Sequence, residues 1–488
     1  MRLAELSKGI GFLANETAGD VEVTHITHDS RKAHSGSVFV AIEGAVLDGH
    51  KYIGWASQLG AVAVVTDKPE KVNCRLPVIV VEKPREAMAR LARRLYNAPD
   101  KRIKVIGVTG TNGKTTTTYL VSQLLTPLAK TGRLGTLTYY NGISEERSLR
   151  TTPEATDIYR MLGEMENNDC VYAAIEISSH GLKLDRVLDL ELHYALFTNL
   201  TQDHLDFHFD MESYFLAKQI QFRHLVPGGV AVINWDDPYG RRIEIPEQTS
   251  LISYGVHADA DLRFEIKKID FTGADFVLFY KGIRQAFHIP LMGGHNVYNF
   301  VAAIAVALSE GRELDELVVA ATNLHSVPGR TETLDLGQEF GVIVDFAHTP
   351  DALKNVLLAC KAVAEGRLIT VFGAGGDKDH TKRPEMGAAV EAHSEVIILT
   401  TDNPRTEDPD AIMDMVQSGM KRRIGGDFTR DWDRKRAIKT ALYLAKPGDM
   451  VLIAGRGHEA YQEINGVQHP FDDREVATHY IRERMGRH

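Results

Sequence analysis

The sequence predicts an α/β protein built from three domains. At 488 residues the chain is longer than one ordinary hydrophobic core supports, which favours about three domains. Short apolar runs alternate with amphipathic stretches, and this alternation is typical of parallel sheets with right-handed helical crossovers. In the second and third parts of the chain, unusual polar segments follow the apolar runs directly. We therefore expect a smaller α/β N-terminal domain, a central P-loop-type doubly wound domain and a Rossmann-like C-terminal domain.

The N-terminal domain is expected to span residues 1–99. The runs 61–66 (AVAVVT) and 78–82 (VIVVE) read as buried strands. The stretch 85–96 carries apolar residues at positions 88, 91, 92 and 95, which is helical spacing. The polar segment 97–101 (NAPDK) predicts the linker to the next domain.

The central domain is expected to span residues 100–328, and the C-terminal domain residues 329–488. Strands are predicted in both domains, and the weaker alternating stretch 251–290 predicts some antiparallel β structure. The first helix of the C-terminal domain is well signalled, because Thr349 can cap it and Pro350 suits its first turn. The predicted strands are 104–109, 171–177, 194–199, 230–234, 342–346, 368–372, 395–400 and 450–454.

Composition excludes several classes of protein. A formal net charge of −10 argues against a nonspecific nucleic-acid binder. The N-terminal residues lack a secretory apolar stretch, and no run approaches the roughly 20 apolar residues that span a bilayer. The sparse cysteines have no metal-ligand spacing and fit a reducing compartment. We expect a cytoplasmic protein that acts as a monomer, without nucleic acid and without membrane insertion.

Seven polar segments follow predicted strands of the second and third domains. Ligands of doubly wound sheets bind outside the carboxyl ends of the strands, so these segments predict a site at those edges. The segments are TGTNGKT (109–115), EISSH (176–180), TNLTQDHLDFH (198–208), DFAHTP (345–350), GAGGDKD (373–379), TDNPR (401–405) and GRGHE (455–459).

The first segment reads as a variant phosphate-binding loop. Gly110 and Gly113 let backbone N–H groups approach a phosphate, Lys114 can reach the outer phosphates, and Thr115 can hold Mg²⁺. Val108 stands where the strict P-loop pattern has glycine. Glu176 ends the next predicted strand, where a carboxylate would bind the Mg²⁺ of a nucleotide; a solvent-facing strand end is the alternative reading.

Two further groups of side chains are candidates for chemistry. His204 and His208, with acidic neighbours, resemble a metal cluster with a preference for magnesium over zinc, although capping or core roles remain open. Arg383 and Arg405 offer planar forks that match a carboxylate, and Glu459 offers an opposite charge to an ammonium. Together the last three predict a pocket for a zwitterion, although for each residue alone a surface charge is the commoner interpretation.

These motifs, together with HNVYN (295–299) and PGR (328–330), resemble the Mur ligases in the order expected over nearly the whole chain. The DSR (29–31), DNPR and GRGHE segments are similar to those of the members that add meso-diaminopimelate to UDP-N-acetylmuramoyl-L-alanyl-D-glutamate. The resemblance implies ATP and Mg²⁺ as cofactors, and that UDP-linked dipeptide and meso-diaminopimelate as the partners to be joined. The reaction would pass through an acyl phosphate, and the two arginines would grip the distal carboxylate of the acceptor.

The resemblance also implies roles for single residues. Lys114, Lys218 and His204 would be catalytic, with Lys218 carbamylated, and Thr115, Glu176 and Lys218 would support the metal ions. The ATP-binding residues would be Gly110, Thr111, Asn112, Gly113, Lys114, Thr115, Thr116, Asn299, Arg330 and Asp345. The residues that bind the UDP-dipeptide or the amino acid would be Ser30, Thr151, Thr152, Ser178, Arg186, Arg383, Asp402, Asn403, Pro404, Arg405, Gly455 and Glu459.

Three alternatives remain open at this point. The chain could be the L-lysine-adding homologue, or an ATP-dependent amino-acid ligase of the folylpolyglutamate or cyanophycin type. It could also be a nucleotide-switched binding protein without ligase chemistry. The DSR segment disfavours the second alternative, and Lys114, Glu176 and the acceptor-side arginines disfavour the third.

Overall fold

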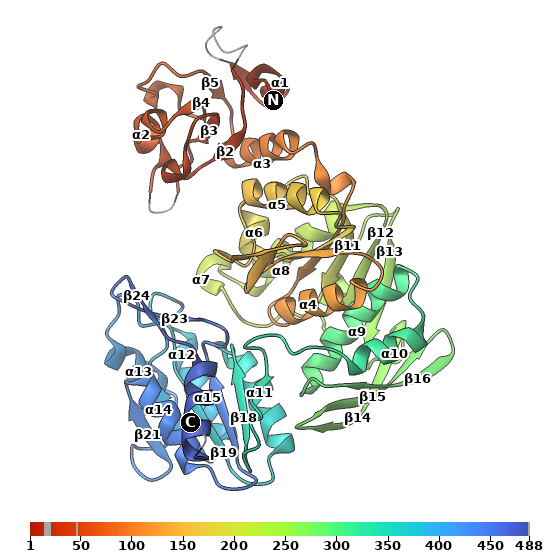
Figure 1. Ribbon diagram of the computed structural model, residues 1–488, viewed down its shortest axis with the longest axis vertical. Helices are drawn as coiled ribbons and strands as arrows, with labels where there is room; N and C mark the ends of the chain where they lie inside the picture. The colour runs from red at the N-terminus through yellow and green to blue at the C-terminus, as the bar shows by residue number, and fades with distance from the viewer. Residues whose placement is uncertain (14–20, 45–46, 487–488) are drawn as a thin grey trace.

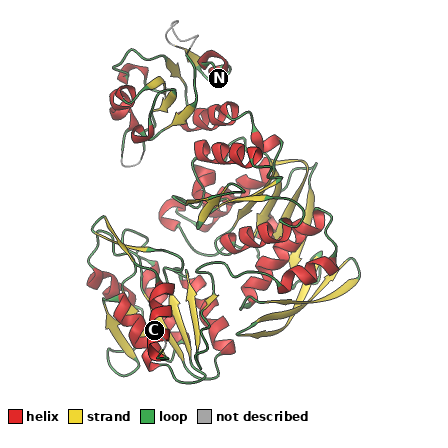
Figure 2. Ribbon diagram, in the orientation of Figure 1, coloured by secondary structure: helices red, strands yellow, loops and turns green. Residues whose placement is uncertain are grey.

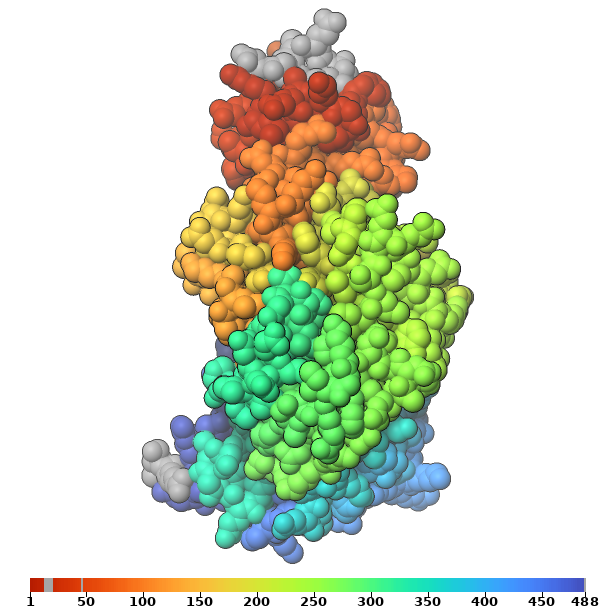
Figure 3. Space-filling view, turned by 90° about the vertical axis from the view of Figure 1, so that its right-hand side faces the viewer, coloured from red at the N-terminus to blue at the C-terminus, as the bar shows by residue number. Residues whose placement is uncertain are grey.

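The computed structural model describes residues 1–13, 21–44 and 47–486. Three sheet-containing units follow one another along the long axis of the molecule, as Figures 1 and 3 show from two directions. Helices flank the sheets, and Figure 2 shows how the two kinds of element are distributed. The α/β class with parallel-rich sheets is therefore confirmed.

The N-terminal unit has a five-stranded sheet in the order β1-β5-β4-β3-β2. Only β1 runs antiparallel to its neighbour, at the edge. Helix α3 packs against helix α5 of the central unit, so that one hydrophobic cluster continues from the first unit into the second. The elements are α1 (Leu3–Ser7), β1 (Phe12–Leu13), β2 (His25–Thr27), η2 (Ser30–Lys32), β3 (Ser37–Val40), η3 (Gly49–Tyr52), α2 (Ile53–Gln58), β4 (Ala61–Thr66), η4 (Pro69–Lys71), β5 (Val78–Val80) and α3 (Pro84–Leu95).

The central unit is built on an eleven-stranded sheet, in the order β16-β15-β14-β13-β12-β11-β6-β10-β7-β8-β9. Helices α4, α9 and α10 cover one face of the sheet, and α5 and α8 cover the other. The apolar residues of these two groups of helices belong to two separate hydrophobic clusters. The strands are β6 (Lys104–Thr109), β7 (Thr131–Leu134), β8 (Thr138–Tyr140), β9 (Glu145–Arg147), β10 (Tyr172–Glu176), β11 (Leu192–Phe197), β12 (Leu225–Asn234), β13 (Ser250–Gly255), β14 (Leu262–Asp270), β15 (Gly273–Tyr280) and β16 (Ile283–Ile289). The helices are η5 (Pro99–Lys101), α4 (Lys114–Leu125), α5 (Ala155–Asn167), α6 (Ser179–Lys183), α7 (Leu205–His208), α8 (Met211–Gln219), η6 (Ile220–His224), η7 (Gly240–Arg242), α9 (Gly294–Ser309) and α10 (Leu314–Thr322).

The C-terminal unit has a six-stranded sheet in the order β17-β18-β22-β19-β20-β21, and only β17 is antiparallel to its neighbour. Helices α11, α12 and α13 pack on one face and α14 and α15 on the other. The strands are β17 (Glu332–Thr333), β18 (Gly341–Asp345), β19 (Leu368–Phe372), β20 (Val396–Thr400), β21 (Phe428–Asp431), β22 (Met450–Ala454) and the separate hairpin β23 (Tyr461–Ile464) and β24 (Val467–Pro470). The helices are α11 (Pro350–Val363), α12 (Lys382–His393), α13 (Pro409–Ser418), α14 (Arg434–Leu444) and α15 (Asp473–Arg484).

Most predicted elements are confirmed to within a few residues, including β4, β6, β19, β22 and helix α3. The cap of α11 is also confirmed, since the Thr349 hydroxyl accepts a hydrogen bond from the Ala352 amide at 3.3 Å. The expectation of antiparallel structure over 251–290 holds for β14 to β16, but β13 pairs parallel on both sides. Among the described residues, no helix is long and apolar enough to cross a bilayer.

Candidate active site between the central and C-terminal sheets

All seven polar segments meet at one cavity of about 1060 Å³. Three of them follow β6, β10 and β11 of the central sheet, and four follow β18, β19, β20 and β22 of the C-terminal sheet. In parallel sheets the carboxyl ends of the strands share an edge, which explains why segments far apart in the sequence converge. The two edges face each other, so the cavity has one wall from each sheet.

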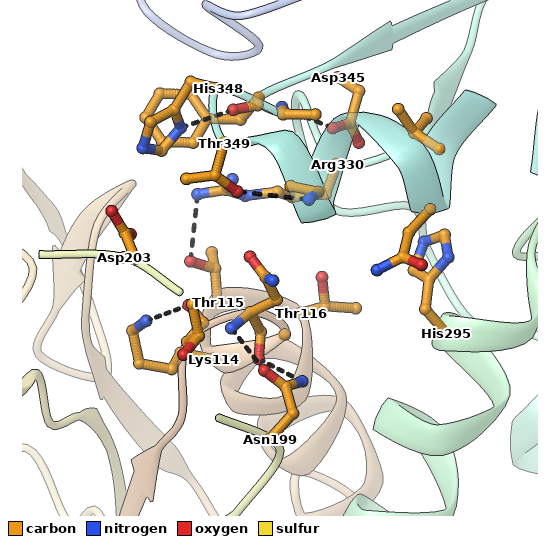
Figure 4. Close-up of a pocket in the computed structure, with 18 of the residues that line it drawn as sticks. Lys114, Thr115, Thr116, Asn199, Asp203, His295, Arg330, Asp345, His348 and Thr349 are labelled. Carbon is orange, nitrogen blue, oxygen red and sulfur yellow. Dashed lines mark hydrogen bonds between the residues drawn. The ribbon is translucent and has the colours of Figure 1, made fainter. Parts of the chain in front are cut away.

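The phosphate-binding loop forms the floor of the cavity on the central side (Figure 4). Gly110 has a φ of +150°, and a Cβ atom there would lie 1.8 Å from the Thr198 hydroxyl, so no other residue fits. The Lys114 amine donates hydrogen bonds to the carbonyls of Gly110 and Thr111, each at 2.9 Å. Burial lowers the pKa of Lys114, so a phosphate that restored a counter-charge would be bound firmly.

Glu176 lies fully buried beside this loop. Its Oε2 accepts hydrogen bonds from the hydroxyls of Thr115 and Thr136, each at 3.0 Å, and its Oε1 accepts one from the Thr136 amide at 2.8 Å. A hydroxyl and a carboxylate side by side at a phosphate loop fit a Mg²⁺ ion, which uses one or two protein oxygens and keeps water and phosphate oxygens for the rest.

Lys218 of helix α8 is buried under the same loop. Its amine donates a hydrogen bond to the Gly110 carbonyl at 2.8 Å and lies 4.5 Å from the centre of the Tyr214 ring. Its pKa lies well below the usual value, because the amine is desolvated and lies near the charge of Lys114. Helical spacing alone would place Lys218 on the surface, and the fold instead turns this face of α8 inward.

His204 lines the cavity with a left-handed backbone, at a φ of +54°, and its Nε2 lies 3.4 Å from the Asp203 carboxylate. Burial lowers the pKa of His204 to about 3 despite that carboxylate. The expected metal cluster of His204 and His208 is not supported: within the described ranges no three histidine, cysteine or acidic side chains could hold a metal ion together. His208 instead bonds the Ser179 hydroxyl at 2.8 Å.

Arg330 reaches across from the junction before the C-terminal sheet. Its guanidinium lies 4.3 Å from the Phe346 ring centre and donates a hydrogen bond to the Thr115 hydroxyl at 3.3 Å (Figure 4). Asp345 lines the same wall and accepts hydrogen bonds from the amides of Thr331 and Ala347 at 2.6 and 2.7 Å. These contacts order the wall that faces the phosphate loop.

Asn299 packs against the turn of the phosphate loop from helix α9. Its side-chain oxygen accepts a hydrogen bond from the Thr117 hydroxyl at 3.3 Å, and a Cβ atom on Gly113 would lie 2.4 Å from that oxygen. The structure thus brings together at the cavity most of the residues expected to bind ATP, namely Thr111, Asn112, Gly113, Lys114, Thr115, Thr116, Asn299, Arg330 and Asp345.

The opposite wall carries the segments after β20 and β22. The Asn403 amide donates a hydrogen bond to the Glu459 carboxylate at 2.6 Å, while its oxygen accepts one from Arg456 at 2.9 Å. Burial and the neighbouring Asp402 raise the pKa of Glu459 to about 7, although Arg456 and Asn403 oppose the shift. Asp402, Asn403, Arg405, Gly455 and Glu459 all line the cavity.

Arg405 holds the turn between these segments and the β23–β24 hairpin. Its guanidinium donates a hydrogen bond to the Gly376 carbonyl at 2.6 Å, and its Nε lies 3.6 Å from the Glu463 carboxylate. About a quarter of the side chain is exposed, so the guanidinium can also meet a ligand in the cavity.

Arg383 does not lie on the cavity wall, in contrast to the expected pair of arginines. Its side chain is 1% exposed, and its guanidinium donates two hydrogen bonds to the Glu407 carboxylate, both at 2.8 Å, and one to the Gly375 carbonyl. The pairing with Arg383 lowers the pKa of Glu407 to about 2. In this structure Arg383 therefore joins the loop after β19 to the segment after β20.

Residues expected to hold the UDP-linked dipeptide lie in two places. Thr151 lines the cavity, whereas Thr152 is fully buried; its hydroxyl donates a hydrogen bond to the Glu176 carbonyl at 2.8 Å and lies 3.0 Å from the Ser178 hydroxyl. Arg186 donates to the Thr152 carbonyl at 3.1 Å. Ser30 lies in the N-terminal unit and takes no part in this cavity, nor do Pro404, Gly110 and Lys218 line it directly.

Sequence reasoning missed several residues of the site. His180 and Lys378 lie inside segments that the motif search singled out, but each is one polar residue among several there. Arg456 and Glu407 act through partners that are distant in the sequence, so no spacing rule reveals them.

Comparison with known proteins agrees with this geometry. Residues 22–96, 108–307 and 329–457 match the models of the Mur ligase catalytic, middle and glutamate ligase domains, in that order. The chain is 41% identical over 461 residues, 93% of each chain, to a UDP-N-acetylmuramoyl-L-alanyl-D-glutamate--2,6-diaminopimelate ligase of Fusobacterium nucleatum. It is 43% identical over 460 residues, 94% of each chain, to the enzyme of the same description from Aquifex aeolicus.

A solved structure of a UDP-N-acetylmuramoyl-L-alanyl-D-glutamate--2,6-diaminopimelate ligase superimposes with a TM-score of 0.68 at 33% identity, over 99% of both chains. The likeness spans all three units and both walls of the cavity, so it is not confined to the nucleotide-binding unit. On these grounds the chain belongs to the Mur ligase family.

Proposed function

We propose that this ligase joins meso-diaminopimelate to the D-glutamate γ-carboxylate of UDP-N-acetylmuramoyl-L-alanyl-D-glutamate, with ATP as the energy source. The observation that carries the proposal is the single cavity in which the phosphate-binding loop faces the Asp402–Arg405 turn. The names of the relatives and of the superimposable structure support the choice of substrates. The proposal includes action in the cytoplasm as a monomer.

The first half of the reaction would take place over the central sheet. A carboxylate is a poor acyl donor, so the γ-carboxylate first attacks the γ-phosphate of ATP to give an acyl phosphate. Lys114 would leave the loop carbonyls that it now bonds and stabilise the negative charge on the transferring phosphoryl group. Thr115 and Glu176 would hold Mg²⁺, which neutralises charge on the phosphates.

Lys218 is proposed to support this half-reaction as a carbamate. An amine can react with CO₂ only in its uncharged form, and burial favours that form for Lys218. The product would be a carboxylate under the phosphate loop, able to support a second Mg²⁺. His204, on the cavity wall beside Asp203, is proposed to assist on the phosphate side.

The acceptor amino acid would bind at the C-terminal wall. Arg405 would grip its distal carboxylate, and Glu459 and Asp402 would face its distal ammonium. Lysine lacks the distal carboxylate, so it would leave Arg405 without that partner. Arg383 contributes by holding the loop next to Arg405 through Glu407.

The UDP-linked dipeptide is proposed to extend from the cavity toward the N-terminal unit. Thr151, Thr152, Ser178 and Arg186 would hold the muramoyl-dipeptide, and Ser30 the uridine end. The three units would then be residues 1–99 for the UDP precursor, 100–328 for ATP and 329–488 for the amino acid.

The test supplies the protein with ATP, Mg²⁺, the UDP-muramoyl-dipeptide and a panel of amino acids, and weighs the product. A mass increase that corresponds to one diaminopimelate is expected. An increase that corresponds to lysine in preference would contradict the proposed specificity, and ATP hydrolysis without any adduct would contradict the ligase reaction.

Arg405→Ala tests the acceptor site separately. The variant should raise the KM for diaminopimelate about 10- to 100-fold, as expected for loss of a charged hydrogen-bond partner worth ~1.5–3 kcal/mol. The KM for ATP should stay within about twofold. Equal changes in both KM values would show that Arg405 does not bind the acceptor specifically.

A further inference from the structure

His180 is a cavity residue to which the proposed reaction has so far given no task. It lies in helix α6 and is the last residue of the segment 176–180, which also carries Glu176 and Ser178. Neither of its ring nitrogens forms a hydrogen bond with any described residue. The ring is nevertheless held in place, because it stacks on Phe207 at 4.1 Å between centres and meets His204 edge-on at 4.8 Å. Aromatic contacts therefore fix the imidazole and leave its nitrogens available.

His180 lies between the central unit and the C-terminal unit. On its own side lie Thr151 and Ser178, proposed to hold the dipeptide whose carboxylate becomes the acyl phosphate. From the C-terminal unit, Lys378 comes close enough for its charge to act on the imidazole. His180 thus lies between the residues proposed to hold the dipeptide and a lysine of the C-terminal unit.

The second half-reaction needs a proton acceptor. An amino acid carries its amine as an ammonium at neutral pH, and an ammonium has no lone pair with which to attack. We propose that His180 is the general base that removes a proton from the acceptor's attacking ammonium. This inference rests on the proposed function and adds a catalytic residue to it.

The imidazole takes one proton from the ammonium, and the freed lone pair forms the C–N bond to the acyl carbon. The C–O bond to phosphate breaks, and the phosphate leaves with the bonding electron pair. The second proton lost by the nitrogen goes to that phosphate, and the imidazolium returns its own proton to water.

Burial and the nearby charges keep the imidazole of His180 in its uncharged form, which can accept a proton. Burial has the largest effect on the pKa of His180 and lowers it, so the ring is uncharged at neutral pH. The charges of Arg186 and Lys378 lower the pKa further, and those of Asp206 and Asp203 oppose them. The rings of His204 and His208 also face it.

The other histidines of the cavity are less suited to this step. His204 and His348 have pKa values lowered to about 3 and about 4, which makes them weak bases at neutral pH. His348 also uses its Nδ1 on the Phe346 carbonyl at 2.9 Å, and His295 bonds the Thr331 hydroxyl at 3.1 Å. Of the four, His180 alone has both ring nitrogens without a hydrogen-bond or ion-pair partner among the described residues, whereas a nitrogen of His204 lies 3.4 Å from the Asp203 carboxylate.

The experiment compares two nucleophiles in the same enzyme. Diaminopimelate arrives as an ammonium, whereas hydroxylamine is largely uncharged at neutral pH and traps an acyl phosphate as a hydroxamate without needing a base. His180→Phe keeps a ring to stack on Phe207 but has no nitrogen, and His180→Gln keeps polarity without basicity. His325→Gln, at an exposed position away from the cavity, is the matched control.

Both His180 variants should lose about 10²–10³-fold in kcat with diaminopimelate, the usual contribution of a general base. ATP-dependent hydroxamate formation should stay within about threefold of the parent, and the lost activity should recover as pH rises and frees the amine. An equal loss with both nucleophiles, or no loss with either, would overturn the assignment. If the parent itself forms no adduct with diaminopimelate but does form hydroxamate, the substrate proposal fails and not the base.

Discussion

At the scale of single residues, burial governs the chemistry of the cavity. Lys114, Lys218 and Glu459 are all removed from water, and in each case burial is the largest cause of the shift in pKa. The charged form of each group is therefore costly until a ligand supplies a partner. We therefore expect substrate binding to change the protonation of these groups.

Lys114→Ala should reduce ligase turnover by at least ~10³-fold, because the transferring phosphoryl group would lose the cation proposed to stabilise its charge. The release of ADP in the presence of both substrates measures the effect. Lys361→Ala, on the exposed side of helix α11, serves as the control and should keep parental activity. If Lys114→Ala kept turnover within tenfold of the parent, the Lys114 amine would have no major part in phosphoryl transfer.

The raised pKa of Glu459 predicts that acceptor binding depends on pH. Its pKa is raised to about 7, so the carboxyl is increasingly protonated below that pH and ionised above it. An ammonium binds the ionised form, and kcat/KM for diaminopimelate should therefore fall as pH drops from about 8 to about 6. Glu459→Gln should abolish this fall while it lowers kcat/KM at pH 8. If kcat/KM for diaminopimelate still falls with pH in Glu459→Gln, another group is responsible for the pH dependence.

At the scale of elements, one buried ion pair fixes the ends of β20 and β22, which carry the wall proposed to bind the acceptor. Arg434, at the start of α14, donates hydrogen bonds to Asp473 at 2.7 and 2.6 Å, and neither side chain is exposed. The same guanidinium donates to the carbonyls of Thr401 and Ala454, at 3.2 and 3.0 Å. Asp402 and Gly455 follow those carbonyls directly, so the pair sets their positions.

Arg434→Met should lower the free energy of unfolding of the C-terminal unit by ~3–5 kcal/mol, because Asp473 is left buried without a partner. Urea unfolding followed by circular dichroism measures it. The double variant Arg434→Met, Asp473→Leu should recover most of the stability, since neither charge remains. A double variant as unstable as the single one would show that the backbone contacts matter more than the pair.

At the scale of the whole molecule, the central and C-terminal units touch across the cavity. The Asn112 amide donates a hydrogen bond to the Asp351 carboxylate at 2.9 Å, which links the phosphate loop to helix α11. On the outer side, the Arg147 guanidinium lies 4.7 Å from the ring centre of Tyr461, in the hairpin after the GRGHE segment. These contacts hold the two walls of the cavity facing each other.

The contact of Arg147 with Tyr461 should make a measurable contribution to this closed arrangement. Arg147→Ala and Tyr461→Leu are each expected to lower kcat/KM for the acceptor, and the double variant should be no worse than either single one. The coupling between them should be ~0.5–1 kcal/mol, as for other partly exposed cation–π pairs. Strictly additive effects in this double-mutant cycle would mean that the contact plays no part in catalysis.

Local chemistry made much of the fold predictable. Apolar runs such as 104–109 and 450–454 form the buried strands expected of them, and Thr349 caps its helix as its residue type predicts. The hairpin of β23 and β24 escaped prediction because its residues are mostly exposed and carry no apolar period. The phosphate loop and the position of Glu176 at the end of β10 followed from motifs, since each lies at or next to a strand end.

The sequence by itself determined the α/β class, the three units and the chemical groups available at the strand ends, because these depend on residue type and on spacing along the chain. The tertiary structure alone decided which groups share a cavity. In the folded chain Arg383 pairs with Glu407 and does not line the cavity, and Lys218 is buried under the phosphate loop. His180 lines the cavity, and its ring nitrogens have no hydrogen-bond partner among the described residues. Burial and charge act through space, and neighbours in space from distant segments are set by how the sheets pack.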